Sequence, residues 1–548
     1  MRKIIIILSY LYFSLSASAS NKDSLKVKNI VTFSKSYEML RYYHPDSDFK
    51  SSNWNDFVEM NVDSILQNEN IQMRRFLNKS FSFLPMTNFS TTVSERNSNG
   101  LNGCNQKYYT NYHGYSEKNS PLYFSERLKT DKSNYLKSVK TSTNIYINFP
   151  VFTCNEVNNC VPNIDYQTKT KKTKYLTNLI MINAICNQFY PNKIKLEKIN
   201  TQFEEYIERI LNSDDDDLVF ILKNYVALLK DDHVLLRWAK AKKKKKSDLF
   251  LFGLDWELTQ DSTLKVLQTH SLFKKLKNTE IIAINSVLIK DKVNYYSQVT
   301  PSANWHSIID KMIDNLKVIK DTNDLKVTVI NQDGKTETLK ISNYLNITDF
   351  LSWENENLSS KKEETINDSI KYINLTTNSF KKSLTFLKTN VTKSDYLFLD
   401  MRGRPYGGCY DFLASLYTTE VTDSFMNITV KNIESTYFEK SSWEITPSTD
   451  NKIEYKKLFI LINHKTLSYG ESIAYFLSKL PNSYLVGTQS SGCNGSVTSA
   501  TLDDLTFRFT GMSVDYKNNR TPTALYPDIQ YQFEYKKLSK KDFIMIIN

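Results

Sequence analysis

The chain has 548 residues, of which 40% are hydrophobic and 24% charged, and its formal net charge is +12. This length is too great for one hydrophobic core, and the balanced composition excludes a wholly disordered chain. The positive charge favours contact with acidic surfaces or polymers, but it identifies no partner.

The first twenty residues, MRKIIIILSYLYFSLSASAS, have the pattern of a cleavable secretory signal. A short basic start is followed by an apolar run and by small residues that end at Ala19. We expect cleavage near Ala19, which makes residues 1–19 the signal peptide, and export to the periplasm or the extracellular space. No other segment reaches membrane-spanning length, so we expect no stable membrane insertion.

Residues 20–235 are expected to form a helical region with an irregular middle. Apolar residues recur at helical spacing over about 25–67, interrupted by HPDSDFKSSN, and again over about 173–229. The part between, about 88–163, is polar and tyrosine-rich and predicts loops with short strands. The lysine run 242–246 that follows predicts a solvated loop; the alternative is a patch that binds polyanions.

The chain has six cysteines, an even number that is compatible with disulfides in an exported protein. Cys154 and Cys160 are near enough in sequence to close a small loop. No CxxC pair is accompanied by histidines, so we expect no structural zinc.

Two further units follow. Residues 248–346 read as strands, one helix at WHSIIDKMIDNL and a hairpin with an Asp-Gly turn, which together make a compact β-rich module. Residues 347–548 alternate strand and helix, a pattern that implies parallel strands joined by crossover helices.

The stretch TLSYGES has two interpretations. Ser468 followed by Glu471 ahead of an apolar run is a capping-box signature for the start of a helix. The same position places the Ser468 hydroxyl beside free backbone N–H groups, where a nucleophile would be useful. A serine needs a base to become a nucleophile, so the stretch by itself leaves both interpretations open.

Two other segments bear on this choice. His233 lies in a polar turn, DDHV, between apolar runs that would hold it rigidly. The strand LFLDMRG is followed by the paired glycines Gly407 and Gly408 in a chain that has only 13 glycines. Such a cluster suggests backbone that approaches a ligand closely or directs N–H groups at an anion.

LFLDMRGRPYGG, TLSYGES, LVGTQSSGCNG and LYPDIQ occur in the order found in the C-terminal-processing-peptidase and tricorn-core family of serine peptidases, which the chain therefore resembles. The resemblance implies an α/β multidomain protein. It would contain a helical N-terminal region, a PDZ-like module at 248–346 and a crotonase-like α/β catalytic domain at 347–548.

The resemblance also implies roles for individual residues. Ser468 matches the nucleophile, and the N–H of Tyr469 with that of Gly407 or Gly408 matches the oxyanion hole. Cys493 and Asn494 fall where one branch of the family has a lysine base, whereas KDDHV is similar to the histidine segment of the tricorn-like bacterial branch, so His233 is the expected base. Asp515 and Thr521 are the candidates for a third member.

The sequence thus predicts an exported serine endopeptidase that cleaves peptides or unfolded protein segments without cofactor or metal. Nucleic acid is not expected as a partner, and the oligomeric state stays open. The alternatives are a catalytically inactive peptide-binding protein on the same fold and adhesion to polyanions through the lysine run. Cys409 and Cys493 fall on loops expected to border the site, and we hypothesise a disulfide between them.

Overall fold

The computed structural model describes residues 24–548 with internal gaps, which are 48–49, 52, 69, 94–105, 118–119, 121, 132–135, 155–161, 165, 167–169, 240–249, 320–324, 358–361, 406, 432–435, 449–452, 517–523 and 534–537. The expected signal peptide and the lysine run lie outside the described residues. None of the described helices is long and apolar enough to cross a membrane.

The N-terminal region is helical, as the sequence predicts. The first helix spans residues 24–43. It is followed by α2 (Asn53–Gln67), α3 (Met73–Ser80), α4 (Lys171–Phe189), α5 (Lys193–Asn212) and α6 (Leu218–Ala227). The buried aromatic rings of these helices form one core, within which Trp54 and Phe57 meet edge to face with ring centroids 5.3 Å apart.

The middle of this region contains more regular structure than its composition suggests. The strands β1 (Asn88–Ser90), β4 (Leu136–Ser142) and β5 (Ile145–Pro150) form a small sheet in the order β1-β5-β4. The strands β2 (Lys107–His113) and β3 (Phe124–Thr130) instead join a large sheet whose other strands come mostly from the C-terminal part of the chain.

The β-rich module has the elements predicted from the sequence and one additional helix. Its sheet consists of β8 (Leu254–Leu258), β9 (Leu264–Thr269), β10 (Glu280–Ile284), β11 (Val287–Leu288), β13 (Leu325–Ile330) and β14 (Thr336–Ile341). The expected helix is α8 (Trp305–Lys317), and the additional one is α7 (Ile289–Val299). The predicted turn forms between β13 and β14, where Gly334 has a φ of +76°. Two short strands, β7 (Phe250–Leu251) and β12 (Val318–Ile319), pair with each other, and α9 (Ile347–Asn357) follows the module.

The C-terminal part contains the predicted parallel sheet. Its order is β15-β16-β17-β20-β21-β24, and all neighbours are parallel except β15 and β16. The strands are β15 (Glu363–Asn367), β16 (Ile370–Asn374), β17 (Tyr396–Asp400), β20 (Lys457–Ile462), β21 (Ser483–Gly487) and β24 (Ile529–Gln530). The helices are α10 (Phe380–Asn390), α11 (Tyr410–Ala414), α12 (Tyr469–Leu477) and α13 (Lys540–Ile547). Because β17 and β20 are parallel neighbours, the loops after them open at one edge of the sheet.

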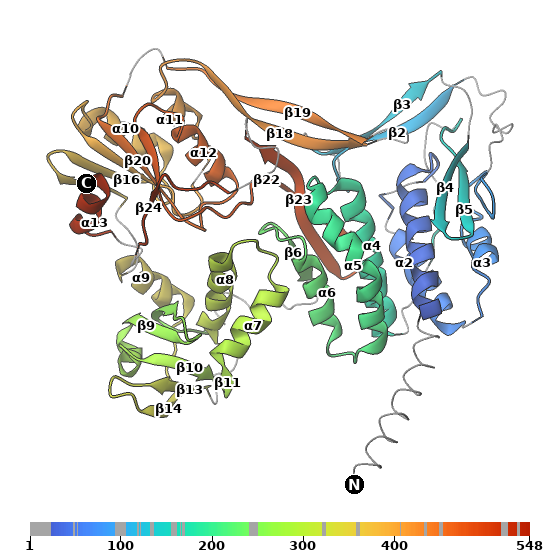
Figure 1. Ribbon diagram of the computed structural model, residues 1–548, viewed down its shortest axis with the longest axis horizontal. Coiled ribbons are helices and arrows are strands. Elements are labelled where there is room, and N and C mark those ends of the chain that lie inside the picture. The colour runs from blue at the N-terminus through green and yellow to red at the C-terminus, as the bar shows by residue number, and fades with distance from the viewer. Residues whose placement is uncertain are drawn as a thin grey trace, which may run out of the picture.

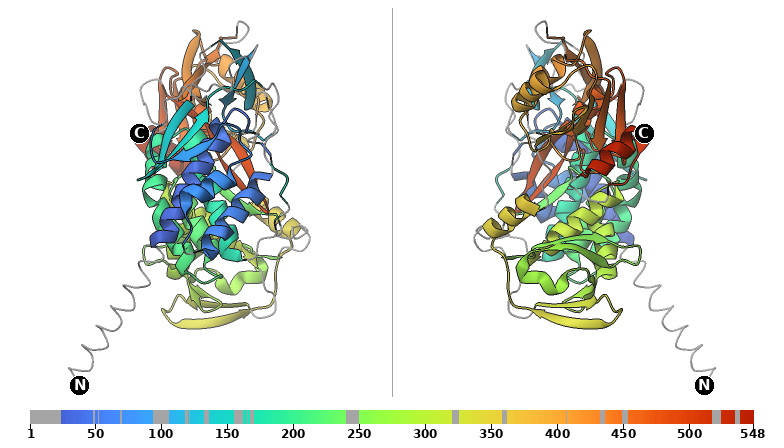
Figure 2. Two further views of the ribbon diagram at one scale, coloured as in Figure 1. Left: turned by 90° about the vertical axis from the view of Figure 1, so that its right-hand side faces the viewer. Right: turned by 90° about the vertical axis from the view of Figure 1, so that its left-hand side faces the viewer.

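A second, seven-stranded sheet connects the parts of the molecule. Its path is β22-β23-β18-β2-β3, with β19 beside β18 and β6 beside β23. Four of its strands are β18 (Val421–Lys431), β19 (Thr436–Ile445), β22 (Gly495–Leu502) and β23 (Leu505–Asp515), and β6 (Leu235–Trp238) directly follows the histidine segment. Figure 1 shows β18 and β19 extending from the α/β unit toward β2 and β3. Figure 1 and Figure 2 show the β-rich module at the end of the molecule opposite to β2 and β3, and Figure 1 shows the N-terminal helices beside it.

Candidate active site

Ser468 occupies a strained turn between β20 and α12. Its backbone has φ 54° and ψ −124°, a conformation that non-glycine residues rarely adopt. The capping box predicted from the sequence is present, and Glu471 Oε2 accepts a hydrogen bond from Ser468 N at 3.3 Å. The Ser468 hydroxyl donates to the carbonyl oxygen of Gly495 at 3.2 Å. Capping and an accessible hydroxyl are therefore compatible at this residue.

Glu471 fixes the next loop against this turn. Its buried carboxylate accepts hydrogen bonds from Ser490 Oγ (2.5 Å), Gly492 N (2.8 Å) and Cys493 N (3.1 Å), as well as from Ser468 N. Burial raises the pKa of Glu471 to about 7 although these hydrogen bonds act to lower it. One side chain thus links the start of α12 to the loop at 490–493.

His233 reaches the site from the N-terminal region. It lies in the turn between α6 and β6, and its backbone N donates to Asp231 Oδ1 at 2.9 Å. The next residues, β6, pair with β23, so that Leu235 lies opposite Arg508. This pairing anchors the histidine segment to the sheet that also carries Thr510.

Thr510 and Asp231 orient the imidazole ring. His233 Nδ1 is 3.0 Å from Thr510 Oγ1, and this hydroxyl donates in turn to Asp231 Oδ2 at 2.6 Å. Because the Thr510 hydroxyl donates its hydrogen bond to the carboxylate, its oxygen accepts a hydrogen bond from the Nδ1–H of His233. Nε2 of the neutral ring then carries the lone pair, which is the tautomer that a general base requires.

The charge state of this group favours base chemistry. Although burial raises the pKa of Asp231, the charges of His233 and Lys195 and the hydrogen bonds from Cys493 and Thr510 bring it below its usual value. Burial lowers the pKa of His233, with Asp231 opposing this shift and Arg508 contributing to it. His233 is therefore neutral, and Asp231 is ionised, at neutral pH.

Ser468 and His233 line the same cavity, whose volume is about 830 Å³. The other lining residues are Asp232, Arg404, Pro405, Gly407, Met426, Trp443, Leu467, Tyr469, Ser472, Asn494, Gly495, Ser496, Val497, Arg508, Met512 and Val514. No lysine is found among these described residues.

The predicted oxyanion donors lie in different positions. Tyr469 is the first residue of α12, where helix geometry leaves its N–H without an intrahelical partner, and both Tyr469 and Gly407 line the cavity. Gly408, with a φ of +87°, is not among the lining residues. The Tyr469 hydroxyl accepts hydrogen bonds from the backbone of Cys409, at 3.1 Å, and of Gly408. Gly407 is therefore the better placed of the two glycines.

The disulfide hypothesis for Cys409 and Cys493 is wrong, because both are free, buried thiols. Cys493 Sγ instead donates to Asp231 Oδ1 at 2.9 Å and lies 3.2 Å from His233 Nδ1. Cys154 is disulfide-bonded. Cys160 lies outside the described residues, so the Cys154–Cys160 pairing stays a prediction.

The sequence named Asp515 and Thr521 as candidates for a third catalytic member, and both stay predictions. Asp515 ends β23, where the described structure does not include its side chain, and Thr521 lies outside the described residues. Sequence reasoning missed Asp231 and Thr510. The doubled aspartate in KDDHV was a usable signal for Asp231, whereas nothing in the sequence near Thr510 indicates its contact with His233.

Asp231, His233 and Cys493 bring three potential metal-binding atoms within 4.8 Å of one another. Each of these side chains already takes part in the hydrogen bonds described above. Burial and the neighbouring Asp231 raise the pKa of the Cys493 thiol well above its usual value, which favours a protonated donor over a thiolate ligand. The cluster therefore fits a hydrogen-bond network better than a metal site.

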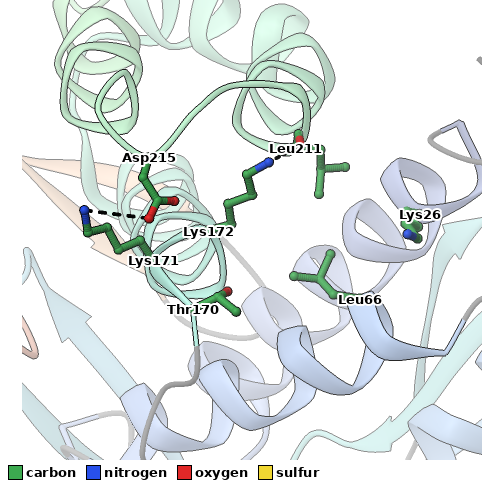
Figure 3. Close-up of a pocket in the computed structure, with 7 residues that line it drawn as sticks. All are labelled: Lys26, Leu66, Thr170, Lys171, Lys172, Leu211 and Asp215. Carbon is green, nitrogen blue, oxygen red and sulfur yellow. Dashed lines mark hydrogen bonds and ion pairs between the residues drawn. The ribbon is translucent and has the colours of Figure 1, made fainter. Parts of the chain in front are cut away.

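A second cavity, of about 660 Å³, lies among the N-terminal helices. Figure 3 shows Lys172 donating to the carbonyl oxygen of Leu211 (2.8 Å) and Lys171 paired with Asp215 (3.7 Å) at its border. Its described lining contains Thr170, Asp215 and three lysines but no histidine, serine or cysteine, so it offers no serine–histidine or cysteine–histidine pair.

A serine on a strained strand-to-helix turn, in one cavity with a histidine that a carboxylate orients, defines a serine-type hydrolase site. Residues 343–531 match the model of peptidase family S41. The C-terminal part of this chain is thus a serine-type peptidase domain of family S41, and the resemblance inferred from the sequence is confirmed.

Two solved structures of mature CPAF support the fold. Mature CPAF complexed with lactacystin is 9% identical, with a TM-score of 0.51 over 66% of this chain and 94% of that chain. Mature CPAF is 10% identical, with a TM-score of 0.50 over 66% and 93%. The photosystem II D1 C-terminal processing protease also matches, at 12% identity over 68% and 95% of the chains, with a TM-score of 0.39. No curated protein matches the sequence.

Proposed function

We propose that this protein is an exported serine endopeptidase that cleaves peptides or unfolded protein segments, with Ser468 as nucleophile and His233 as general base. The observation that carries the proposal is the shared cavity, which is lined by Ser468 and by a histidine whose Nδ1 is held by Thr510 and, through it, Asp231. The secretory pattern of residues 1–19 supports export, and mass spectrometry of the secreted chain should find a start near Ser20.

The reaction uses groups that already face the cavity. The Ser468 oxygen attacks the scissile carbonyl carbon, and its proton passes to Nε2 of His233. The N–H groups of Tyr469 and Gly407 stabilise the resulting oxyanion, by about 2.7 to 4 kcal/mol per donor. His233 then gives the proton to the leaving amine. In the second half, water loses a proton to His233 and attacks the acyl carbon, which releases the acid and restores Ser468.

An extended peptide has an edge to pair with. β22 lies at the end of the seven-stranded sheet, and its residues Gly495, Ser496 and Val497 line the cavity. A substrate that adds a strand beside β22 would place its main chain next to Ser468, whose hydroxyl contacts the Gly495 carbonyl. We further propose that the β-rich module is PDZ-like and binds peptide termini in the same strand-addition mode.

A fluorophosphonate probe tests the nucleophile. Labelling of the mature protein should be lost in Ser468→Ala and reduced at least tenfold in His233→Ala. Ser297→Ala, at a half-buried serine whose hydroxyl donates to Asn294 O, serves as control and should label normally. Labelling that persists in Ser468→Ala, at an intact fold, would remove the assignment.

One observation favours the alternative of an inactive peptide-binding protein. The Ser468 hydroxyl donates to Gly495 O, and no hydrogen bond joins it to His233 among the described residues. In the alternative, wild-type protein fails to label but still binds unfolded peptide. Active peptidases also tighten such contacts only when substrate binds, so we place the endopeptidase first.

A further inference from the structure

Two positive charges that form no ion pair among the described residues line the cavity together with Ser468 and His233. Arg404, in the loop after β17, and Arg508, on β23, both line the cavity with Ser468 and His233. Both charges act to lower the pKa of His233, which places them within electrostatic reach of the base. Among the described residues, no carboxylate forms an ion pair with either guanidinium.

The acidic residue of the cavity is already neutralised. Asp232 Oδ1 pairs with Lys311 Nζ at 2.6 Å, and its Oδ2 accepts from Ser302 Oγ at 2.8 Å and Ser491 Oγ at 2.6 Å. Asp232 is thus not available to offset Arg404 or Arg508. The remaining charge of the cavity is positive.

The two guanidiniums differ in what holds them. Arg508 is partly buried, and its Nε donates to the carbonyl oxygen of His233 at 3.0 Å, which fixes the side chain beside the base. Arg404 is exposed, and the preceding Gly403 packs against Thr376. Among the described residues, no hydrogen bond or ion pair involves the Arg404 side chain, so it can bind a ligand without losing one, whereas Arg508 also supports the histidine segment.

The rest of the lining is largely apolar. Met426, Trp443, Leu467, Val497, Met512 and Val514 contribute to it, and Trp443 stacks on Tyr469 with ring centroids 6.1 Å apart. A cavity with apolar walls strengthens the attraction between a guanidinium and a carboxylate because water screens it less. Such a cavity suits a peptide that has both an apolar and an acidic side chain near the scissile bond.

We infer that this peptidase prefers substrates with a carboxylate within two or three residues of the scissile bond, bound by Arg404, while Arg508 adds positive charge to the same cavity. The inference deepens the proposed function and rests on it. When the scissile bond lies in the middle of a chain, the carboxylate must come from an acidic side chain. A free C-terminal carboxylate offers the same chemistry, so the test separates the two.

Matched fluorogenic peptides test the inference. Each pair differs only by Glu or Gln at one position from the third residue before to the third residue after the scissile bond, with amidated C-termini. We expect kcat/KM to favour Glu by about 5- to 20-fold at one position at least, because a charge-assisted hydrogen bond contributes more than a neutral one. The ratio should fall as salt rises.

Variants locate the effect. Arg404→Gln should reduce the Glu-to-Gln ratio toward one, and Arg404→Lys should keep part of it because the charge stays. Arg75→Gln, at an exposed arginine on α3, is the matched control and should leave the ratio unchanged. If peptides are preferred only when their C-terminus is free, the arginines bind the terminal carboxylate and not an acidic side chain, which would overturn the inference.

Different experimental outcomes would reject the inference and the proposed function. Equal rates for every Glu and Gln pair, with either C-terminus, or a ratio that Arg404→Gln leaves unchanged would overturn the inference, while fluorophosphonate labelling would still show a peptidase. Anisotropy of the same labelled peptides on Ser468→Ala measures preference without cleavage. If wild-type protein neither labels nor cleaves but Ser468→Ala binds Glu peptides more tightly, the inference survives and the proposed function falls.

Discussion

At the scale of residues, the sequence named Ser468 and His233 as candidates, but not the groups that orient the imidazole ring of His233. The local pattern left Ser468 open between cap and nucleophile. The resemblance of its ordered motifs, and of KDDHV, to the serine-peptidase family made Ser468 and His233 the candidate nucleophile and base. Thr510 contacts His233 across 277 positions of the chain, and only the pairing of β6 with β23 brings the two together. A contact that depends on tertiary strand pairing has no local sequence signal.

Thr510 offers a clean test of this orientation. Thr510→Val removes the hydroxyl that holds Nδ1 of His233 but keeps a similar shape. We expect kcat to fall on the order of 10- to 100-fold with little change in KM, because a displaced base affects the chemical step more than binding. Steady-state kinetics with a cleaved peptide would measure both.

Rescue separates orientation from packing. Thr510→Ser keeps the hydroxyl and should retain most of the activity, although it loses the methyl group. If Thr510→Ser is as impaired as Thr510→Val at equal unfolding stability, the threonine acts through packing and the hydrogen-bond chain to Asp231 is not needed.

At the scale of elements, regular apolar periodicity predicted most helices and strands, whereas elements and contacts that depend on tertiary context were missed. The N-terminal helices, the hairpin β13–β14 and the alternating strands and helices of the parallel sheet follow from apolar spacing. α7 was missed because it starts directly after β11 with no side-chain cap to signal it. Free Cys409 and Cys493 show the same limit: residues of both loops, Gly407 and Asn494, line the cavity as expected, yet the Cys493 thiol donates to Asp231.

Glu471, at the start of α12, makes the free energy of unfolding depend on pH. Burial raises the pKa of Glu471 to about 7 in the folded protein, above the ordinary value of 4.5 that applies when it is unfolded. The folded state therefore binds more protons between these pH values, so this group makes the free energy of unfolding decrease as pH rises from about 4.5 to about 7. Glu471→Gln cannot titrate and should lack this contribution.

Denaturant titrations at several pH values measure the effect as a difference between wild type and Glu471→Gln. Glutamine cannot replace all the acceptor positions of the carboxylate, so we expect the variant to be less stable throughout, with the deficit shrinking as pH rises through the window. A deficit that grows with pH would mean that the four hydrogen bonds outweigh burial and that the pKa is not raised.

At the scale of the whole molecule, three distant parts of the chain meet at the site. The N-terminal region supplies His233, the C-terminal part supplies Ser468, and the β-rich module contacts both sides. Ser302 and Lys311 of the module bond Asp232, the neighbour of His233. On the other side, Asp310 pairs with His464 Nε2 at 2.7 Å and with Lys465 Nζ at 2.8 Å, in the loop that leads to Ser468.

This arrangement predicts that the module tunes the base through charge. Lys311 compensates Asp232, whose negative charge favours the protonated form of His233. In Lys311→Met that charge is less compensated, so the pKa of His233 should rise. Because the base works only when neutral, the acidic limb of the pH profile of kcat/KM should move to higher pH.

The control for this change is Lys317→Met, which removes a lysine from the same helix, where it pairs with Asp314 at 3.7 Å and not with Asp232. Its acidic limb should match that of the wild type. If Lys311→Met lowers kcat/KM equally at every pH, Lys311 holds the module in place without tuning the base. A shift of the limb to lower pH would contradict the charge argument itself, because removing a cation near His233 cannot make its protonation harder unless Asp232 also moves away.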